Sequence, residues 1–267
     1  MNKCIGAGAK LLRGDALVEL PSLNSAEARE KVLYFRKWLV VVVLIGLVSG
    51  FGALIFNLMV EHAMAFFLTN LAGYKPPLPG EFYGEFTYPA EGALIMLSLT
   101  VGGLISGLVV SKVAPEAEGH GTDAAVEAFH HKEGKVRARV PLVKMVASAV
   151  TIGSGGSGGK EGPVAQIGAG FGSLISSLFK MKPKERRMAA AIGLGSGISA
   201  MFKTPFGGAI FASEVLYMMD FEPEVIPLAF IASFIGYLVV GYFTGWGTYS
   251  RRRYQQRQLT SSTTRSP

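Results

Sequence analysis

Long apolar runs without a charged side chain alternate with short polar, basic segments along this sequence. The runs cover residues 38–60, 92–111, 145–159, 162–179, 188–202 and 225–250. A run of about 18 or more apolar residues is long enough to cross a bilayer as a helix. Several runs reach that length, and others are shorter and interrupted by glycine or proline. The pattern predicts an all-α polytopic membrane protein, so the lipid bilayer is its first expected partner.

The same pattern predicts where the helices lie. We expect them over residues 32–68, 90–113, 122–129, 140–152, 163–179, 185–202, 206–219 and 226–245. Gly46 and Gly50 in the first helix, like Gly103 and Gly107 in the second, have a spacing that allows close packing of a neighbouring helix.

The composition agrees with a membrane protein: 49% of residues are hydrophobic and 17% are charged, with a mean hydropathy of +0.36. Soluble domains carry about 25% charged residues. The net charge of +7 does not indicate nucleic acid, because the basic residues cluster between the spans. From a cytoplasmic N-terminus, alternating spans place all three clusters on one side. The clusters are Lys3, Lys10, Arg13, Arg29, Lys31, Arg36 and Lys37; Lys132, Lys135, Arg137, Arg139 and Lys144; and Lys180, Lys182, Lys184, Arg186 and Arg187.

Three segments follow from this organisation. Residues 1–31 form a polar cytoplasmic segment, residues 32–246 form the transmembrane domain, and residues 247–267 form a polar basic tail. Alternation of the spans places the tail outside, where its basic residues, among them Arg251, Arg252, Arg253 and Arg257, do not fit. We therefore expect that the tail is not a natural continuation of the domain, or that the chain is incomplete. The single cysteine, Cys4, excludes an intrachain disulfide.

A glycine-rich segment, residues 153–170, lies between two apolar helices and contains three misleading motifs. Residues 153–158 match the dinucleotide fingerprint in letters, without the strand and the later acid that it needs. Residues 155–159 match a nucleophile elbow without its strand-to-helix context. Residues 154–161 fail the spacing and the final residue of a phosphate loop. No paired carboxylates, metal cluster or nucleophile–base pair occurs elsewhere, so we expect neither an enzyme nor a metal site or organic cofactor.

The physical character of this segment indicates an anion site. Glycine-rich, non-helical backbone at membrane depth is tolerated where it is buried in protein or lines a cavity. A helix that begins there directs free N–H groups and a positive dipole end inward, and together these attract an anion. Pro163 suits the first turn of such a helix. The carboxylate of Glu161 either caps this helix or competes with a mobile anion for the same N–H groups.

A second helix start of this kind is expected near Gly119, His120 and Gly121. Either Thr122 or Asp123 is expected to cap it. Discontinuous helices whose ends meet near the middle of the membrane recur in transporters. His120 by itself makes no metal site.

These motifs resemble those of the CLC chloride channels and chloride/proton antiporters. Residues 159–163, Gly-Lys-Glu-Gly-Pro, are similar to that family's glycine–basic–glutamate–glycine–proline signature. Residues 118–123 stand at the place of its first signature, and residues 203–214 resemble its later proline-to-glutamate block. The resemblance covers about residues 32–246. It implies the first of two inverted CLC halves, with broken and re-entrant helices.

The resemblance also implies a homodimer with one chloride pathway in each subunit. Glu161 takes the place of the gating glutamate. The anion is then held mainly by backbone N–H groups. The implied anion-binding residues are Gly119, His120, Gly121, Lys160, Gly162 and Pro163.

Three departures from the family pattern change the expectation. His120 stands where the family often has a serine whose hydroxyl binds the anion, so we expect a different anion selectivity at that contact. Val215 follows Glu214 where many antiporters carry a second, proton-relaying glutamate, and this favours a passive channel. The sequence also ends where the family's first half ends, so the 267-residue chain alone is expected to carry no flux. We expect a voltage-gated-type chloride channel subunit in the inner or cell membrane. The alternatives are a chloride/proton antiporter and a non-conducting membrane scaffold.

Overall fold

The structure, a computed structural model, describes residues 25–74, 92–217 and 225–246. It divides into two compact units, Met1–Lys37 and Trp38–Pro267, and helix α1 passes through the boundary between them. The site lies wholly in the second unit.

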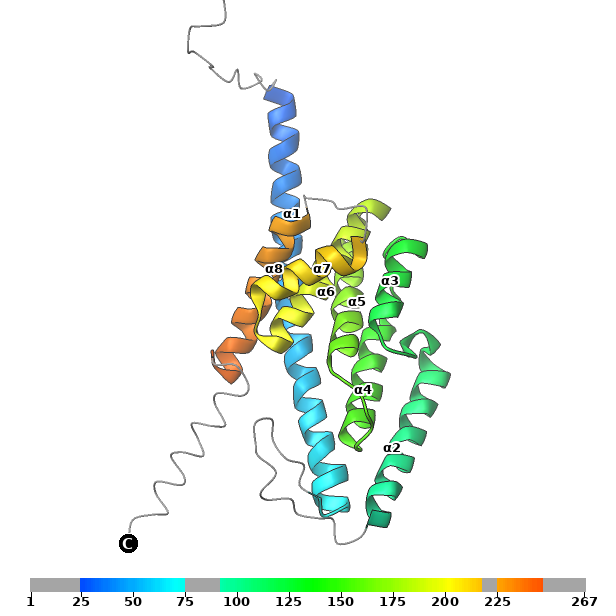
Figure 1. The fold of residues 1–267 in the computed structure, drawn as a ribbon. Helices are drawn as coiled ribbons and strands as arrows, with labels where there is room; N and C mark the ends of the chain where they lie inside the picture. The colour runs from blue at the N-terminus through cyan, green and yellow to red at the C-terminus, as the bar shows by residue number, and fades with distance from the viewer. Residues whose placement is uncertain (1–24, 75–91, 218–224, 247–267) are drawn as a thin grey trace, which may run out of the picture. The chain divides into compact units, whose positions relative to one another are not determined.

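Every regular element in the described residues is a helix (Figure 1). The order is α1 Ser25–Met64, a π-helical turn η1 Ala65–Leu71, α2 Gly92–Val113, a 3-10 turn η2 Pro115–Ala117, α3 Thr122–His131, α4 Arg139–Gly153, α5 Glu161–Leu178, α6 Pro183–Phe202, α7 Pro205–Tyr217 and α8 Val225–Thr244. All eight predicted helices are confirmed, with ends that differ by a few residues. The predicted ends at residues 90–91 and 218–219 lie outside the described residues.

Three helical stretches are long and apolar enough to cross a membrane: Val32–Leu71, Gly92–Val113 and Val225–Thr244. Helix α4, predicted as a span, has 15 residues. At 1.5 Å per residue it reaches about 22 Å, less than the roughly 30 Å of a hydrocarbon core. The domain therefore combines full spans with shorter, broken helices, as the glycine and proline interruptions predicted.

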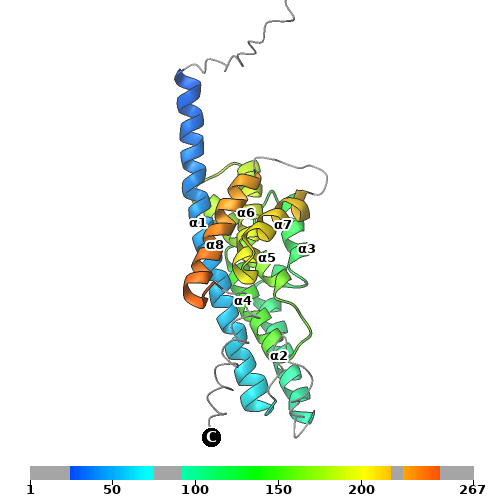
Figure 2. The same cartoon turned by 60° about the vertical axis from the view of Figure 1, so that its left-hand side comes forward.

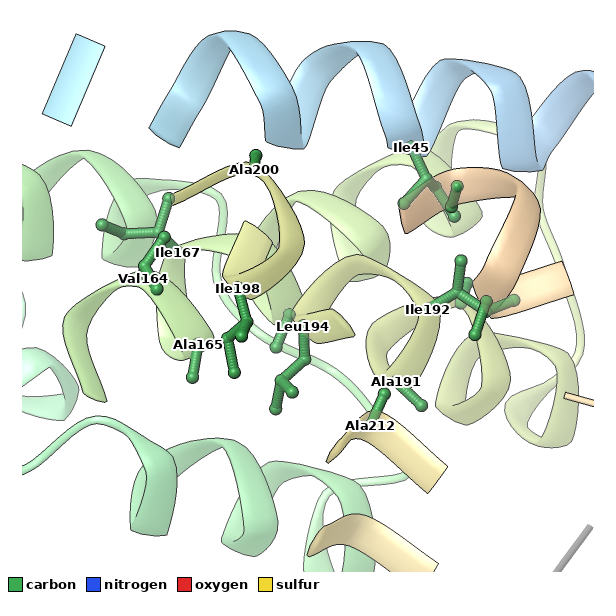
Figure 3. Packing of buried hydrophobic residues seen from close by; sticks show 14 of the residues in the cluster. Ile45, Val164, Ala165, Ile167, Ala191, Ile192, Leu194, Ile198, Ala200 and Ala212 are labelled. Atoms are coloured by element: carbon green, nitrogen blue, oxygen red, sulfur yellow. The ribbon is translucent and has the colours of Figure 1, made fainter. Parts of the chain in front are cut away.

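Helices α5 and α6 pack side by side at the centre of the second unit (Figures 1 and 2). Their glycines allow backbone to touch backbone. A Cβ added to Gly168 would collide with the carbonyl oxygen of Gly193, and one added to Gly172 would collide with that of Ala189. Around this crossing, buried side chains of α1, α5, α6 and α7 form one apolar cluster, which includes Ile45, Val164, Leu194 and Ala212 (Figure 3).

The glycine spacing predicted for close packing is confirmed in the first helix but not in the second. Gly46 and Gly50 of α1 lie against Ile235 and Val239 of α8. Among the described residues, no atom of another element approaches the Cβ positions of Gly103 or Gly107. Gly102, next to them, packs on Ser154 instead, because that face of α2 is the one turned toward α4.

Candidate functional site

Two helix starts, distant in sequence, touch each other in the second unit. A Cβ added to Gly121, just before α3, would collide with the carbonyl group of Gly162 in the first turn of α5. A Cβ added to Gly162 would in turn collide with the carbonyl oxygen of His120. Gly119 and Gly121 have φ angles of 78° and 90°, a region that favours glycine. Gly121 and Gly162 are therefore needed for this close approach, whereas Gly119 is favoured by its φ angle alone.

Each helix start leaves backbone donors without an intrahelical partner. In α5 the first intrahelical bond comes from the N–H of Val164 to the carbonyl oxygen of Lys160, 3.0 Å away. In α3 the first comes from Ala125 to Gly121, also at 3.0 Å. The N–H groups before these residues are available to an anion, and both helix dipoles present their positive ends there.

The predicted side-chain cap of the short helix is wrong. Gly121 occupies the N-cap position of α3 and no side chain caps the helix, so Thr122 and Asp123 are already helical residues. Because neither side chain covers the first N–H groups, the start of α3 stays open to a ligand.

A cavity of about 470 Å³ lies beside this junction. Its wall includes the predicted anion-binding residues Gly119, His120 and Pro163. Gly121 and Gly162 pack together behind that wall. The hydroxyl-bearing residues Ser106, Ser111, Ser148, Thr151 and Ser157 also line the cavity. The hydroxyls of Ser106, Ser111 and Thr151 already donate to other oxygens of the protein. The neutral side-chain donors that the wall offers to a small anion are therefore the hydroxyls of Ser148 and Ser157.

Lys144 of α4 lines the same cavity and was misplaced by the sequence analysis. It was grouped with the loop cations, yet only 3% of it is exposed. Its Nζ donates to the carbonyl oxygens of Ala117, at 3.0 Å, and Gly119, at 2.7 Å. No ion pair joins Lys144 to a carboxylate within the part of the chain that the structure describes. In its ammonium form, Lys144 places at the cavity a positive charge that its carbonyl partners do not balance.

Glu161, the predicted gate, is the first residue of α5 and is exposed. Its carboxylate folds back over Gly159, where it occupies the position that a Cβ on Gly159 would take. Gly159 lines the cavity. The carboxylate therefore lies beside Gly159, a residue of the cavity wall, and belongs to the first residue of α5.

Lys160, also predicted to bind the anion, is directed elsewhere. Its Nζ donates to Oδ1 of Asn57 on α1, 2.7 Å away. Among the described residues that wall the cavity, Lys160 is not included. The structure therefore brings together Gly119, His120, Gly121, Gly162 and Pro163, while the Glu161 carboxylate lies over Gly159 and Lys160 bonds to α1.

Two site residues were missed by sequence reasoning. Lys144 is the sixth residue of α4 and follows the basic residues of the preceding loop, so its local sequence did not indicate burial. Asn57 carried a weak signal, as a polar residue in the long apolar body of α1. Its partner Lys160 is 103 residues away, so this hydrogen bond could not be predicted from the sequence.

Known proteins resemble this chain over most of its length. An uncharacterised protein of Methanocaldococcus jannaschii is 27% identical over 84% of this chain and 49% of its own length. The H(+)/Cl(-) exchange transporter ClcA of Yersinia pestis is 28% identical over 78% of this chain and 42% of its own length. The chain thus spans about half the length of the curated relatives that it matches.

Two solved structures share the fold. A slow cyanobacterial Cl-/H+ antiporter superposes with a TM-score of 0.62 at 21% identity, over 79% of this chain and 48% of that one. A CLC-type fluoride/proton antiporter superposes with a TM-score of 0.60 at 22% identity, over 85% and 49%. The fold class expected from the resemblance, an all-α polytopic membrane fold like that of CLC proteins, is confirmed.

The family model described as voltage gated chloride channel matches residues 102–264. This stretch contains both helix starts, the cavity lysine and Glu161, and it extends into the segment 247–267. The chain belongs to the CLC family of voltage-gated chloride channels and their transporter relatives.

Proposed function

We propose that this chain forms the gated part of a chloride pathway, as the subunit of a CLC-type channel. The observation that carries the proposal is the buried ammonium of Lys144 beside two converging helix starts. A cavity with one fixed positive charge, inward-facing N–H groups and hydroxyls stabilises a small anion without a covalent or metal partner. Chloride enters the cavity as the counter-charge of Lys144.

Glu161 is the gate in this proposal. Its carboxylate folds over Gly159 of the cavity wall, and Glu161 itself belongs to the first turn of α5, whose N–H groups an anion would use. When charged, it competes with chloride for those donors. When protonated, it loses its attraction to the positive helix end and leaves the donors to chloride. Flux is therefore expected to rise as the pH falls.

Passive conduction is the first candidate because Val215, an apolar residue, follows the exposed Glu214 on α7. A chloride/proton exchanger is the second candidate, since a relative of this chain is named as one. The proposal further includes a homodimer in the cell membrane with a cytoplasmic N-terminus and voltage-dependent opening. The basic clusters support a cytoplasmic N-terminus, because basic segments between spans favour the cytoplasmic side. Arg186 of the third cluster pairs with Glu133, next to Lys132 of the second cluster, at 3.1 Å, so these two clusters lie at the same end of the domain.

Chloride efflux from liposomes that contain the protein tests this proposal. We expect efflux that increases at low pH, without coupled proton movement, and a Glu161→Gln variant whose efflux no longer depends on pH. Proton uptake driven by a chloride gradient would instead identify an exchanger. The same chloride efflux measurement, made on the 267-residue chain alone, tests the alternative that it is a non-conducting membrane scaffold. Absence of efflux from the protein at every pH, together with absence of chloride binding, would contradict an anion pathway.

A further inference from the structure

One side of helix α4 forms part of the cavity wall. Lys144, Ala147, Ser148, Thr151 and Ile152 line the cavity, and their spacing of three and four residues places them on one face of the helix. Ser148 comes one turn after Lys144, so about 6 Å of helix axis separates the two residues. The buried lysine and the Ser148 side chain therefore belong to the same strip of the wall.

The hydroxyl of Ser148 makes no hydrogen bond within the part of the chain that the structure describes. A serine or threonine inside a helix often donates to the carbonyl oxygen four residues earlier. Thr151, on the same face, does so, with its Oγ1 2.9 Å from the carbonyl oxygen of Ala147. Ser148 does not, and its oxygen is not enclosed by protein atoms. Its O–H group is therefore free to donate into the cavity.

Ser148 is also better placed than the other free hydroxyl of the wall. Ser148 is half-buried, whereas Ser157 is exposed. An exposed hydroxyl that binds an anion gives up a water molecule in exchange, so the net gain is small. A hydrogen bond in partly buried surroundings is stronger, because the surroundings are less polar than water. An anion in the cavity therefore gains most from the hydroxyl of Ser148.

Lys144 can attract the same anion without touching it. Its Nζ is occupied by the carbonyl oxygens of Ala117 and Gly119, which lie outside α4. A charge in partly buried surroundings still attracts an anion over several ångströms. The lysine thus supplies the charge, and the hydroxyl one turn away supplies a directed hydrogen bond.

We propose that Ser148 is a specificity-determining ligand of the anion in this cavity. Its hydroxyl raises the preference for small, strongly hydrated anions such as chloride relative to large, weakly hydrated ones such as thiocyanate. A small anion loses more hydration energy when it enters the cavity, so it needs a strong hydrogen-bond donor in return. The inference deepens the proposed function and rests on it for the presence of an anion in the cavity.

Isothermal titration of the full chain in detergent, with chloride and separately with thiocyanate, tests the role of Ser148. We expect Ser148→Ala to lower the chloride affinity about two- to tenfold, the value of one hydrogen bond. The thiocyanate affinity should fall by less than about twofold, because a weakly hydrated anion depends less on that bond. Alanine is the better helix former, so this variant is expected to fold.

Two other serines provide comparisons. Ser157→Ala removes the exposed hydroxyl and should lower the chloride affinity less than Ser148→Ala does. Ser177 lies on α5, away from the cavity wall, and its hydroxyl donates to the carbonyl oxygen of Ser173 at 2.8 Å. Ser177→Ala is therefore the matched control and should change neither affinity.

An unchanged chloride affinity in Ser148→Ala, or equal losses for chloride and thiocyanate, would overturn the role of Ser148. Chloride binding by the native protein would then still support the proposed anion cavity. A loss in Ser177→Ala as large as in Ser148→Ala would also overturn the role, since it would show a general effect on the fold. Absence of chloride binding by the native protein would overturn the anion pathway and this inference together. Chloride binding without efflux from liposomes would count against the proposed function alone.

Discussion

Gly121 and Gly162 are in backbone contact, although 40 residues of sequence separate them. The carbonyl group of Gly162 fills the space that a side chain on Gly121 would need. This contact brings the starts of α3 and α5 to one wall of the cavity, so the arrangement of the anion donors depends on it.

Gly121→Ala is expected to destabilise the protein by about 2 kcal/mol or more, because the new Cβ meets the Gly162 carbonyl and the φ of 90° is strained for alanine. Thermal or denaturant unfolding in detergent measures this change. Gly103→Ala is the matched control: it lies inside a helix, facing open space, and should stabilise by about 0.5–1 kcal/mol. Equal effects of the two substitutions would contradict the contact.

Lys144→Met keeps most of the side-chain volume and removes the buried charge. We expect chloride affinity to fall about tenfold or more, because a charged partner is worth about 1.5–3 kcal/mol to a hydrogen-bonded ion. Isothermal titration with chloride measures the affinity. Arg139→Gln removes an exposed cation at the beginning of the same helix and should leave the affinity nearly unchanged. If both variants bind alike, Lys144 is not the counter-charge.

His120→Ala tests whether the anion is held by backbone or by side chain. The glycine φ angles and the free N–H groups remain, so chloride affinity should fall by no more than about fivefold, the value of one ordinary hydrogen bond. Relative permeability to chloride and nitrate should change more than affinity, because His120 lines the cavity. A loss of affinity as large as that of Lys144→Met would show that the imidazole is a principal ligand.

Glu116, in η2, provides a test against pH. Burial, the largest single influence, raises its pKa, but hydrogen bonds from its own N–H and from Arg137, with the charges of Arg137 and Arg139, outweigh burial and hold the pKa below the usual 4.5. A carboxyl with a lowered pKa stabilises the fold above its unfolded-state pKa and loses that contribution as the pH falls through its folded-state pKa.

Glu116→Gln should therefore lower the Tm at pH 7, and the difference from the native protein should shrink below pH 4.5. Thermal unfolding between pH 7 and pH 3 measures this. Glu127→Gln, at an exposed ion pair, is expected to show a smaller difference at pH 7. A Tm difference between Glu116→Gln and the native protein that grows toward low pH would contradict a lowered pKa of Glu116.

The helices and the glycine-built junction were predictable because apolar run length and glycine–proline breaks act locally. The beginning of α5 was predictable from Pro163, and the end of α6 was predictable from the turn at residues 203–205. The burial of Lys144 was not predicted, since a lysine beside a basic loop has the same local sequence whether it faces the loop or the protein interior. The Lys160–Asn57 bond was out of reach for a different reason: it joins segments 103 residues apart.

The crossing of α5 and α6 limits how this domain can move. Gly168 and Gly172 each face an opposing carbonyl with no space for one carbon atom. A slide of α5 along α6, or a rotation about its axis, would drive Ala165, Ala169 or a larger residue into that backbone. Helix α5 is therefore held in place by α6, and under the proposed function the opening and closing of the pathway are expected to arise from side chains at the beginning of α5, of which Glu161 is the first.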